Sequence, residues 1–238
     1  MLAVESKLFI GLATGEIYMY DPFTLELLAK VATCRYATPY AMVLQSAGTL
    51  LVGMNTGSLE VFTFAQQSLL AANPVVNEIK VPYAGEIYCM HVSETTREIA
   101  LATFSGLYIG HFEIGPTGRP HQVWVQNKVM FKDKMISQIC ELRPGHLLVA
   151  EYSKIGYWIV DRTDEEAEMI KIEDTRTDYN SGCVNLIPIP LYDEKWYPYV
   201  ISRTKFKIDL IDLQDRCVMT LCQDTNSTGM TPKMVVQT

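Results

Sequence analysis

Carboxylates are the residues of this sequence that could most readily do chemistry, because paired carboxylates carry out general acid and base catalysis. Three aspartates recur at equivalent places in the chain, and each is followed by turn-forming residues: Asp21, Asp161 and Asp212. An aspartate at the first position of a turn accepts hydrogen bonds from the backbone N–H groups that follow it. The pattern therefore favours a structural role in turns over a catalytic role.

Metal binding and nucleophilic catalysis have no local signature. The histidines form neither a His-x-His nor a His-x-x-x-His pair, and they are His91, His111, His121 and His146. A metal centre needs converging ligands with supporting partners. The sequence also lacks the Gly-x-Ser-x-Gly elbow of serine hydrolases and the Gly-x-x-x-x-Gly-Lys phosphate loop. We therefore expect no catalytic residues, no metal and no cofactor.

Composition places the chain among ordinary globular proteins. It has 238 residues, of which 48% are apolar and 20% charged, and this length can bury a core without metals or disulfides. The net charge of −7 disfavours non-specific binding to nucleic acid or to an anionic membrane. No run approaches the roughly 18 unbroken apolar residues of a membrane helix, and the N-terminal residues lack the pattern of a signal peptide. We expect neither a nucleic-acid partner nor membrane insertion.

The cysteines predict a reducing compartment. None forms a Cys-x-x-Cys pair, and most lie in or near apolar, strand-like runs, where a free cysteine behaves as a small hydrophobe; they are Cys34, Cys89, Cys140, Cys183, Cys217 and Cys222. A disulfide framework is the alternative, but such frameworks belong mainly to shorter secreted domains. We interpret the cysteines as reduced and buried, which indicates a cytosolic or nuclear protein, and we predict a cytoplasmic location.

A short apolar run that contains one small residue recurs five times. The small residues are Gly11, Gly53, Ala102, Ala150 and Ser202. The steps between them are 42, 49, 48 and 52 residues. Periods of about 40–50 residues with strand content throughout are typical of propeller blades.

Each repeat predicts four strands, A to D, in the order of an antiparallel meander. Strand B holds the small residue, and strands C and D follow it with many β-branched and aromatic residues, several of them in alternation with polar ones. The expected A strands are 40–45, 87–92, 136–142 and 183–189. The expected C strands are 16–21, 58–64, 107–114, 157–162 and 206–212, and the expected D strands are 26–31, 78–81, 122–129, 168–172 and 216–222.

The first repeat shows no strand A of its own in this pattern. Residues 231–238 match residues 38–46, which contain the strand A of the second repeat, with one residue deleted. A final strand that pairs into the first blade would remove both open sheet edges, which otherwise favour aggregation. We therefore predict an all-β fold in which residues 1–238 form a single domain, a closed propeller of five four-stranded antiparallel blades. A fragment of a larger propeller is the alternative.

This strand pattern resembles the WD40-like superfamily of β-propellers. The residues that carry the resemblance are the small-x-x-x-Gly runs at 11–15 and 53–57 and the turn aspartates that follow strand C. The likeness covers essentially the whole chain as a strand pattern, whereas the Trp-Asp dipeptide of that superfamily is absent and no Gly-His dipeptide opens a blade. The resemblance implies a non-catalytic interaction platform, commonly one domain of a larger signalling or trafficking protein.

The loops between strands B and C, and between D and A, lie on one face of a propeller because successive strands of a meander alternate in direction. Here these loops are rich in the aromatic and arginine residues that interface hot spots favour. We predict a protein-binding face that carries Tyr36, Tyr83, Phe104, Tyr152, Lys154, Arg203 and Lys205. In the alternative interpretation, some of these rings only cap the packing of the blades.

Two other segments could contact partners. The proline-containing segment 188–198 carries Tyr192, Trp196 and Tyr197, and it exceeds the length that a tight hairpin needs. The acidic stretch 161–178 could dock a basic partner, or it could be a solvated surface.

We predict a non-catalytic scaffold that binds a protein or peptide, and self-association is left open. Two alternatives come from other classes. One is a propeller glycoside hydrolase or lyase, for which Glu141 and Glu151 are the carboxylates placed to approach a central channel. The other is a purely structural dimerisation domain.

Overall fold

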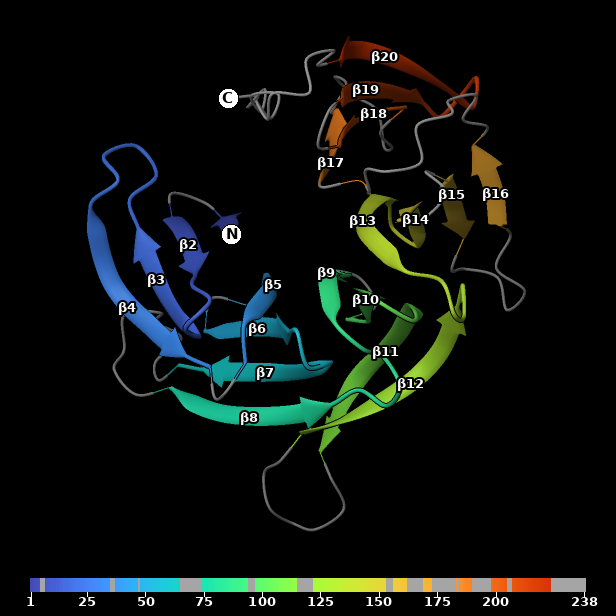
Figure 1. Cartoon of the computed structure of the whole chain (residues 1–238). Coiled ribbons are helices and arrows are strands. Elements are labelled where there is room, and N and C mark those ends of the chain that lie inside the picture. The colour runs from blue at the N-terminus through green and yellow to red at the C-terminus, as the bar shows by residue number, and fades with distance from the viewer. Residues whose placement is uncertain are drawn as a thin grey trace. The chain divides into compact units, whose positions relative to one another are not determined.

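The structure is a computed structural model, and the residues that it describes are 1–4, 7–34, 37–46, 48–64, 74–93, 97–114, 122–152, 156–161, 169–172, 183, 185–189, 198–204 and 207–223. All elements within these ranges are strands, and they form five antiparallel four-stranded sheets (Figure 1). The all-β prediction and the meander order are therefore confirmed. The sheets belong to two compact units, one with β1–β12 and one with β13–β20.

The first unit contains three sheets. The first sheet holds β1 (Leu2–Val4), β2 (Lys7–Gly11), β3 (Glu16–Tyr20) and β4 (Leu27–Thr33). The second sheet holds β5 (Pro39–Ser46), β6 (Thr49–Met54), β7 (Ser58–Thr63) and β8 (Val75–Lys80). The third sheet holds β9 (Ile87–Val92), β10 (Ile99–Thr103), β11 (Gly106–Ile114) and β12 (Gln122–Met130).

The second unit contains two sheets. The fourth sheet holds β13 (Ile136–Arg143), β14 (His146–Glu151), β15 (Gly156–Asp161) and β16 (Met169–Ile172). The fifth sheet holds β17 (Asn185–Ile189), β18 (Tyr199–Arg203), β19 (Lys207–Asp212) and β20 (Cys217–Gln223). In both sheets each strand pairs with its neighbour in the sequence, as a meander requires.

The first sheet corrects one prediction. Strand β1 pairs antiparallel with β2 and places Leu2 opposite Phe9, so this sheet has a first strand of its own. The prediction that residues 231–238 supply that strand is wrong for this edge, because β1 already occupies it; residues 231–238 themselves lie outside the described residues. A strand of three residues is too short to show a period-two pattern, which explains why the sequence did not reveal it.

The small residue of the repeat marks close packing between neighbouring sheets of the first unit. A Cβ atom on Gly11 would lie 2.7 Å from Cγ of Pro39, at the start of β5. A Cβ atom on Gly53 would lie 2.6 Å from Cγ2 of Ile87, at the start of β9. Strand A of the following sheet therefore lies directly against strand B of the preceding one, and the core between them is apolar.

Cys34 follows β4 and is almost fully buried. Burial first, and then the negative charge of Glu60 and a hydrogen bond to it, raise the pKa of this thiol to about 12. Because the thiolate is the reactive form of cysteine, Cys34 is expected to be inert at neutral pH. Cys222 on β20 is exposed, so the prediction of buried cysteines does not hold for every one of them.

We expect iodoacetamide to alkylate Cys222 and to spare Cys34. At about pH 8, a thiol with a pKa of about 12 is ionised to roughly one part in 10⁴, against roughly one part in four for an ordinary cysteine. Peptide mass spectrometry after timed labelling measures the two rates, and similar rates would contradict the burial of Cys34. The pKa of Cys34 is higher in the folded chain than the ordinary value of 9.0. Protonation of this thiol therefore stabilises the fold below about pH 9, and this stabilisation is lost as the pH rises toward 12.

Candidate interaction site

Two of the recurring aspartates have the predicted role in turns. Oδ1 of Asp21 accepts hydrogen bonds from the backbone N–H groups of Phe23 and Thr24, both at 2.8 Å, and these bonds lower the pKa of Asp21. Asp212 accepts the equivalent two bonds at 2.9 and 3.1 Å. The carboxylate of Asp161 lies 3.1 Å from His146 Nε2, and the residues that follow it lie outside the described residues.

The two carboxylates that a glycoside hydrolase or lyase would need, Glu141 and Glu151, do not lie close together. On β13 and β14, Glu141 pairs with Leu147, whereas Glu151 pairs with Ile136. The two glutamates therefore stand five residues apart along β13, which is about 16 Å at the usual strand rise of about 3.3 Å. Glycosidases hold their two carboxyl groups about 5–9.5 Å apart, so this pair cannot flank one glycosidic bond.

Among the described residues, no three His, Cys, Asp or Glu side chains gather closely enough to hold a metal ion. His111 instead contacts Glu113 on the same strand at 3.0 Å. That the chain has no metal and no cofactor stays a prediction. The described elements also include no helix that could cross a membrane.

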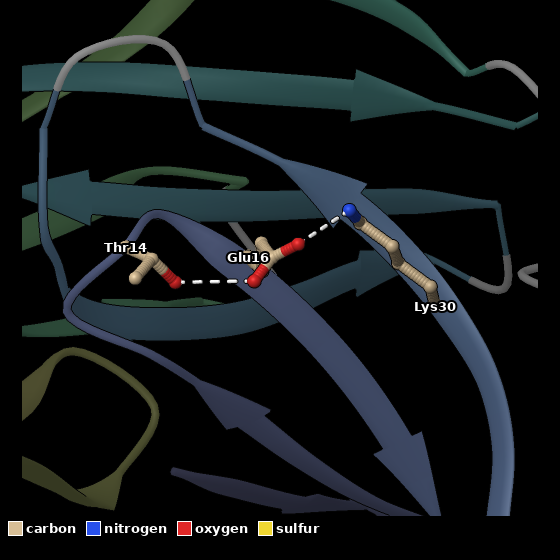
Figure 2. A network of polar contacts seen from close by, with 3 residues as sticks. All are labelled: Thr14, Glu16 and Lys30. Atoms are coloured by element: carbon tan, nitrogen blue, oxygen red, sulfur yellow. Dashed lines mark hydrogen bonds and ion pairs between the residues drawn. The ribbon is translucent and has the colours of Figure 1, made fainter.

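A polar network ties the first B–C turn to the edge of its sheet (Figure 2). Thr14 Oγ1 donates to one carboxylate oxygen of Glu16 at 3.2 Å, and Lys30 Nζ on β4 donates to the other at 2.6 Å. The bond from Lys30 is the main reason that the pKa of Glu16 is lowered. Both side chains reach solvent, and exposed pairs of this kind add little to stability. Lys30 also lines a groove of about 340 Å³ between β4 and β7–β8.

The loop 81–86, which joins β8 to β9 and is called the Tyr83 loop here, presents an aromatic ring almost entirely to solvent. The Tyr83 side chain is 93% exposed, and its φ of +62° lies in the left-handed region. A tyrosine in that region is disfavoured by about 1–2 kcal/mol. Contacts elsewhere in the structure must therefore hold this backbone in place.

The next B–C turn supplies those contacts. The carbonyl of Tyr83 accepts hydrogen bonds from the Ser105 hydroxyl and, at 2.8 Å, from Tyr108 Oη. The backbone N–H of Ser105 donates to Ala84 O at 3.3 Å, and that of Phe104 donates to Glu86 O at 3.0 Å. The Tyr83 loop is thus held along most of its length while its aromatic ring stays free of the core.

Further aromatic rings lie beside this loop. Phe104 is 56% exposed. Its side chain packs against Gly85, because a Cβ atom added to Gly85 would lie 3.0 Å from Cβ of Phe104. Tyr40 and Tyr88 stack with their ring centroids 6.0 Å apart, and Tyr88 Oη donates to the Glu86 carboxylate at 2.6 Å. We call Tyr40, Tyr83, Tyr88 and Phe104 the aromatic cluster.

The structure brings together two of the predicted binding residues, Tyr83 and Phe104. Tyr152 is 44% exposed and Arg203 is half-buried, and both belong to the second unit. The other predicted residues lie outside the described residues: Tyr36, Lys154 and Lys205. The same holds for Tyr192, Trp196 and Tyr197 and for most of the acidic stretch. Whether these residues bind a partner stays a prediction.

Sequence reasoning missed Tyr40 and Tyr88. Both were assigned to strands, and their rings were not considered as binding groups. A signal was present, because each lies at the start of a strand A, where a side chain meets the preceding loop. The stacking of the two rings depends on the packing of β5 against β9, which a sequence pattern does not specify.

Comparison with known proteins supports the fold. No protein-family model and no curated protein matches the chain, whereas 769 chains of solved structures resemble it. One belongs to the "Crystal Structure of Mitotic Checkpoint Complex", with a TM-score of 0.64 and 11% identity over 94% of this chain. This chain spans 62% of that chain's length.

At that identity the likeness concerns the fold alone. The match extends over nearly all of this chain. Together with the four-stranded antiparallel sheets of both units, this match supports the WD40-like propeller fold that the strand pattern resembles.

Proposed function

We propose that this chain is a non-catalytic interaction module that binds a protein or peptide through the aromatic cluster. The observation that carries the proposal is Tyr83, whose ring is almost fully exposed on a backbone that neighbouring hydroxyl groups hold in the left-handed region. A ring on a fixed loop loses little conformational entropy on binding. Tyrosine is also among the residues that most often dominate an interface.

The finer architecture is part of this proposal. Each of the five sheets is taken as one blade of a propeller, and the remaining predicted residues are taken as part of the binding surface: Tyr36, Tyr152, Lys154, Arg203 and Lys205. The matched chain belongs to a structure of a mitotic checkpoint complex, and this is compatible with protein binding. The partner is expected to be a protein or peptide in the cytoplasm.

Replacement of Tyr83 tests the proposal. We expect Tyr83→Ala and Tyr83→Asn to weaken binding to a partner captured by the wild-type chain by about 30-fold, the effect of losing an interface hot spot of about 2 kcal/mol. The asparagine variant is included because asparagine tolerates positive φ. Titration calorimetry with the purified partner measures the affinity, and melting curves verify folding.

Phe23→Ala is the matched control. Phe23 is 86% exposed in the same unit, but it lies in a C–D turn, at the opposite end of its sheet from the B–C turn. Its loss should change the affinity less than twofold. Equal affinity of the wild type and both Tyr83 variants would reject the aromatic cluster as the binding site. Sedimentation of the purified chain distinguishes the dimerisation alternative, which requires self-association.

A further inference from the structure

A buried carboxylate stands at the end of β14 in the second unit. Glu151 is 4% exposed, and it directly follows the small residue of its repeat, a place taken in the first three repeats by Leu12, Met54 and Thr103. A charged group in such a place is costly unless a cation or several hydrogen bonds compensate it. The position of Glu151 therefore points to a cation.

Among the described residues, Lys134 supplies such a cation at a long distance. Lys134 Nζ lies 3.5 Å from Glu151 Oε2, which exceeds the roughly 2.7–2.9 Å of a good charge-assisted hydrogen bond. The same Nζ lies 5.5 Å from the ring centroid of Trp158 on β15, within the range of a cation–π contact. The Lys134 side chain is 44% exposed, so the ammonium group remains partly in water.

Lys134 is the solvent-facing group of this cluster, because its side chain is 44% exposed whereas that of Glu151 is 5% exposed and Nε1 of Trp158 is buried. A Cβ atom at Gly156 would lie 3.2 Å from Trp158 Nε1, which is tight, and 3.7 Å from Glu151 Oε2, which is an ordinary contact distance. Tyr152, which follows Glu151, is 44% exposed, and its backbone N–H donates to Met135 O at 2.9 Å. The backbone beside the carboxylate is therefore hydrogen-bonded, and the partly exposed Lys134 side chain stands between the carboxylate and solvent.

We propose that Glu151 and Trp158 form a receptor for an arginine side chain of a protein partner, and that Lys134 occupies this receptor while no partner is bound. A guanidinium group is planar, so it can lie over the indole and donate two parallel hydrogen bonds to the carboxylate. An ammonium group is a compact, strongly hydrated charge that lacks this two-pronged geometry. Arginine therefore satisfies both groups better than Lys134 does.

The inference goes beyond the proposed function, because it assigns a second site and the chemistry of its ligand. The arginine receptor and the aromatic cluster share no residue, so either can fail while the other holds. The negative charge of the chain, −7, also favours the approach of a basic segment.

A pair of capped tripeptides tests the receptor. One carries arginine between two glycines, and the other carries citrulline, which has nearly the same shape but no charge. Titration followed by the indole N–H resonance of Trp158 in ¹⁵N-labelled protein reports binding, and the indole of Trp124, in the first unit, serves as the internal control. We expect the arginine peptide to shift the Trp158 resonance and the citrulline peptide to bind at least tenfold more weakly.

The Lys134→Ala variant decides between a receptor and a purely structural ion pair. If Lys134 occupies the receptor, its removal should tighten binding of the arginine peptide about fivefold to tenfold, because no internal cation must be displaced. The arginine peptide should also raise the melting temperature of this variant more than that of the wild type. A purely structural pair predicts a lower melting temperature without any gain in binding, and that outcome would overturn the proposal.

Two further variants identify the groups that recognise the guanidinium. Glu151→Gln keeps the shape of the side chain and should abolish the preference for arginine over citrulline. Trp158→Leu removes the cation–π contact and leaves the Glu151 carboxylate in place. It replaces Glu151→Gln as the test if that variant fails to fold, and peptide binding to it is measured by calorimetry. An unchanged preference in the folded variant would reject the receptor.

Discussion

Gly57→Ala is expected to lower the free energy of unfolding by about 3 kcal/mol, the sum of a backbone effect of about 1–2 kcal/mol and a packing effect of similar size. The φ of Gly57 is +79°, which disfavours any residue with a Cβ. A Cβ atom would also lie 2.6 Å from the carbonyl oxygen of Gly85 and 3.2 Å from its nitrogen. These are backbone atoms, and they can retreat only if the Tyr83 loop moves.

Urea denaturation of Gly57→Ala beside Thr56→Ser measures this effect. Thr56 is the exposed neighbour of Gly57, and serine keeps the hydroxyl group that lies 2.9 Å from Ser58 Oγ, so this replacement should change the stability by no more than about 0.5 kcal/mol. A loss of less than about 1 kcal/mol in Gly57→Ala would contradict the close approach of the two loops, because the strain at positive φ alone accounts for that amount. The variant should also weaken partner binding, since Gly57 packs directly against the Tyr83 loop.

The repeat made most of the strand pattern predictable. The apolar runs with Gly11 and Gly53 both form B strands, β2 and β6, and the structure shows why a small residue stands there, since strand A of the next sheet leaves no room for a Cβ. Strand β1 could not be predicted in this way, because three residues carry no periodic signal. The pairing of β1 with β2 is set by contacts that depend on the folded sheet.

The candidate site was predictable only in part. Exposed aromatic residues in loops can be found by their position between strands, and this reasoning identified Tyr83 and Phe104. It gave no indication that Tyr83 adopts a positive φ, because tyrosine rarely does so and the conformation depends on hydroxyl groups of Ser105 and Tyr108. These lie more than twenty positions further along the chain. Such contacts become visible only once the strand register is known.

The same limit applies to the arginine receptor. The sequence pointed to Glu151 only as one of the two carboxylates of the enzyme alternative. The strand register places Glu151 opposite both Ile136 and Gly156, which brings the carboxylate to the side chains of Lys134 and Trp158. The sequence contains the charged groups of Glu151 and Lys134 and the ring of Trp158, but it does not show that they lie close together.

Tyr157→Ala is expected to cost about 4 kcal/mol of stability, as is typical when a large buried aromatic residue is truncated. Tyr157 lies on β15, is 1% exposed and packs in the apolar core of the second unit. Its hydroxyl group lies 2.5 Å from Ser202 Oγ on β18, so one side chain links the fourth sheet to the fifth. Ser202 is itself fully buried and also contacts the thiol of Cys183 at 3.4 Å.

A double-mutant cycle separates the hydroxyl pair from the packing of the ring. Tyr157→Phe and Ser202→Ala should each cost about 1–2 kcal/mol, because each leaves the other hydroxyl group buried without this partner. The double variant should cost less than the sum of the two, since replacing both polar partners by apolar groups is close to neutral. Alanine is already the small residue of the third and fourth repeats, at Ala102 and Ala150, so Ser202→Ala introduces no steric conflict of its own. Strictly additive losses in urea denaturation would show that the two hydroxyl groups do not interact, and the link between the fourth and fifth sheets would then rest on apolar packing alone.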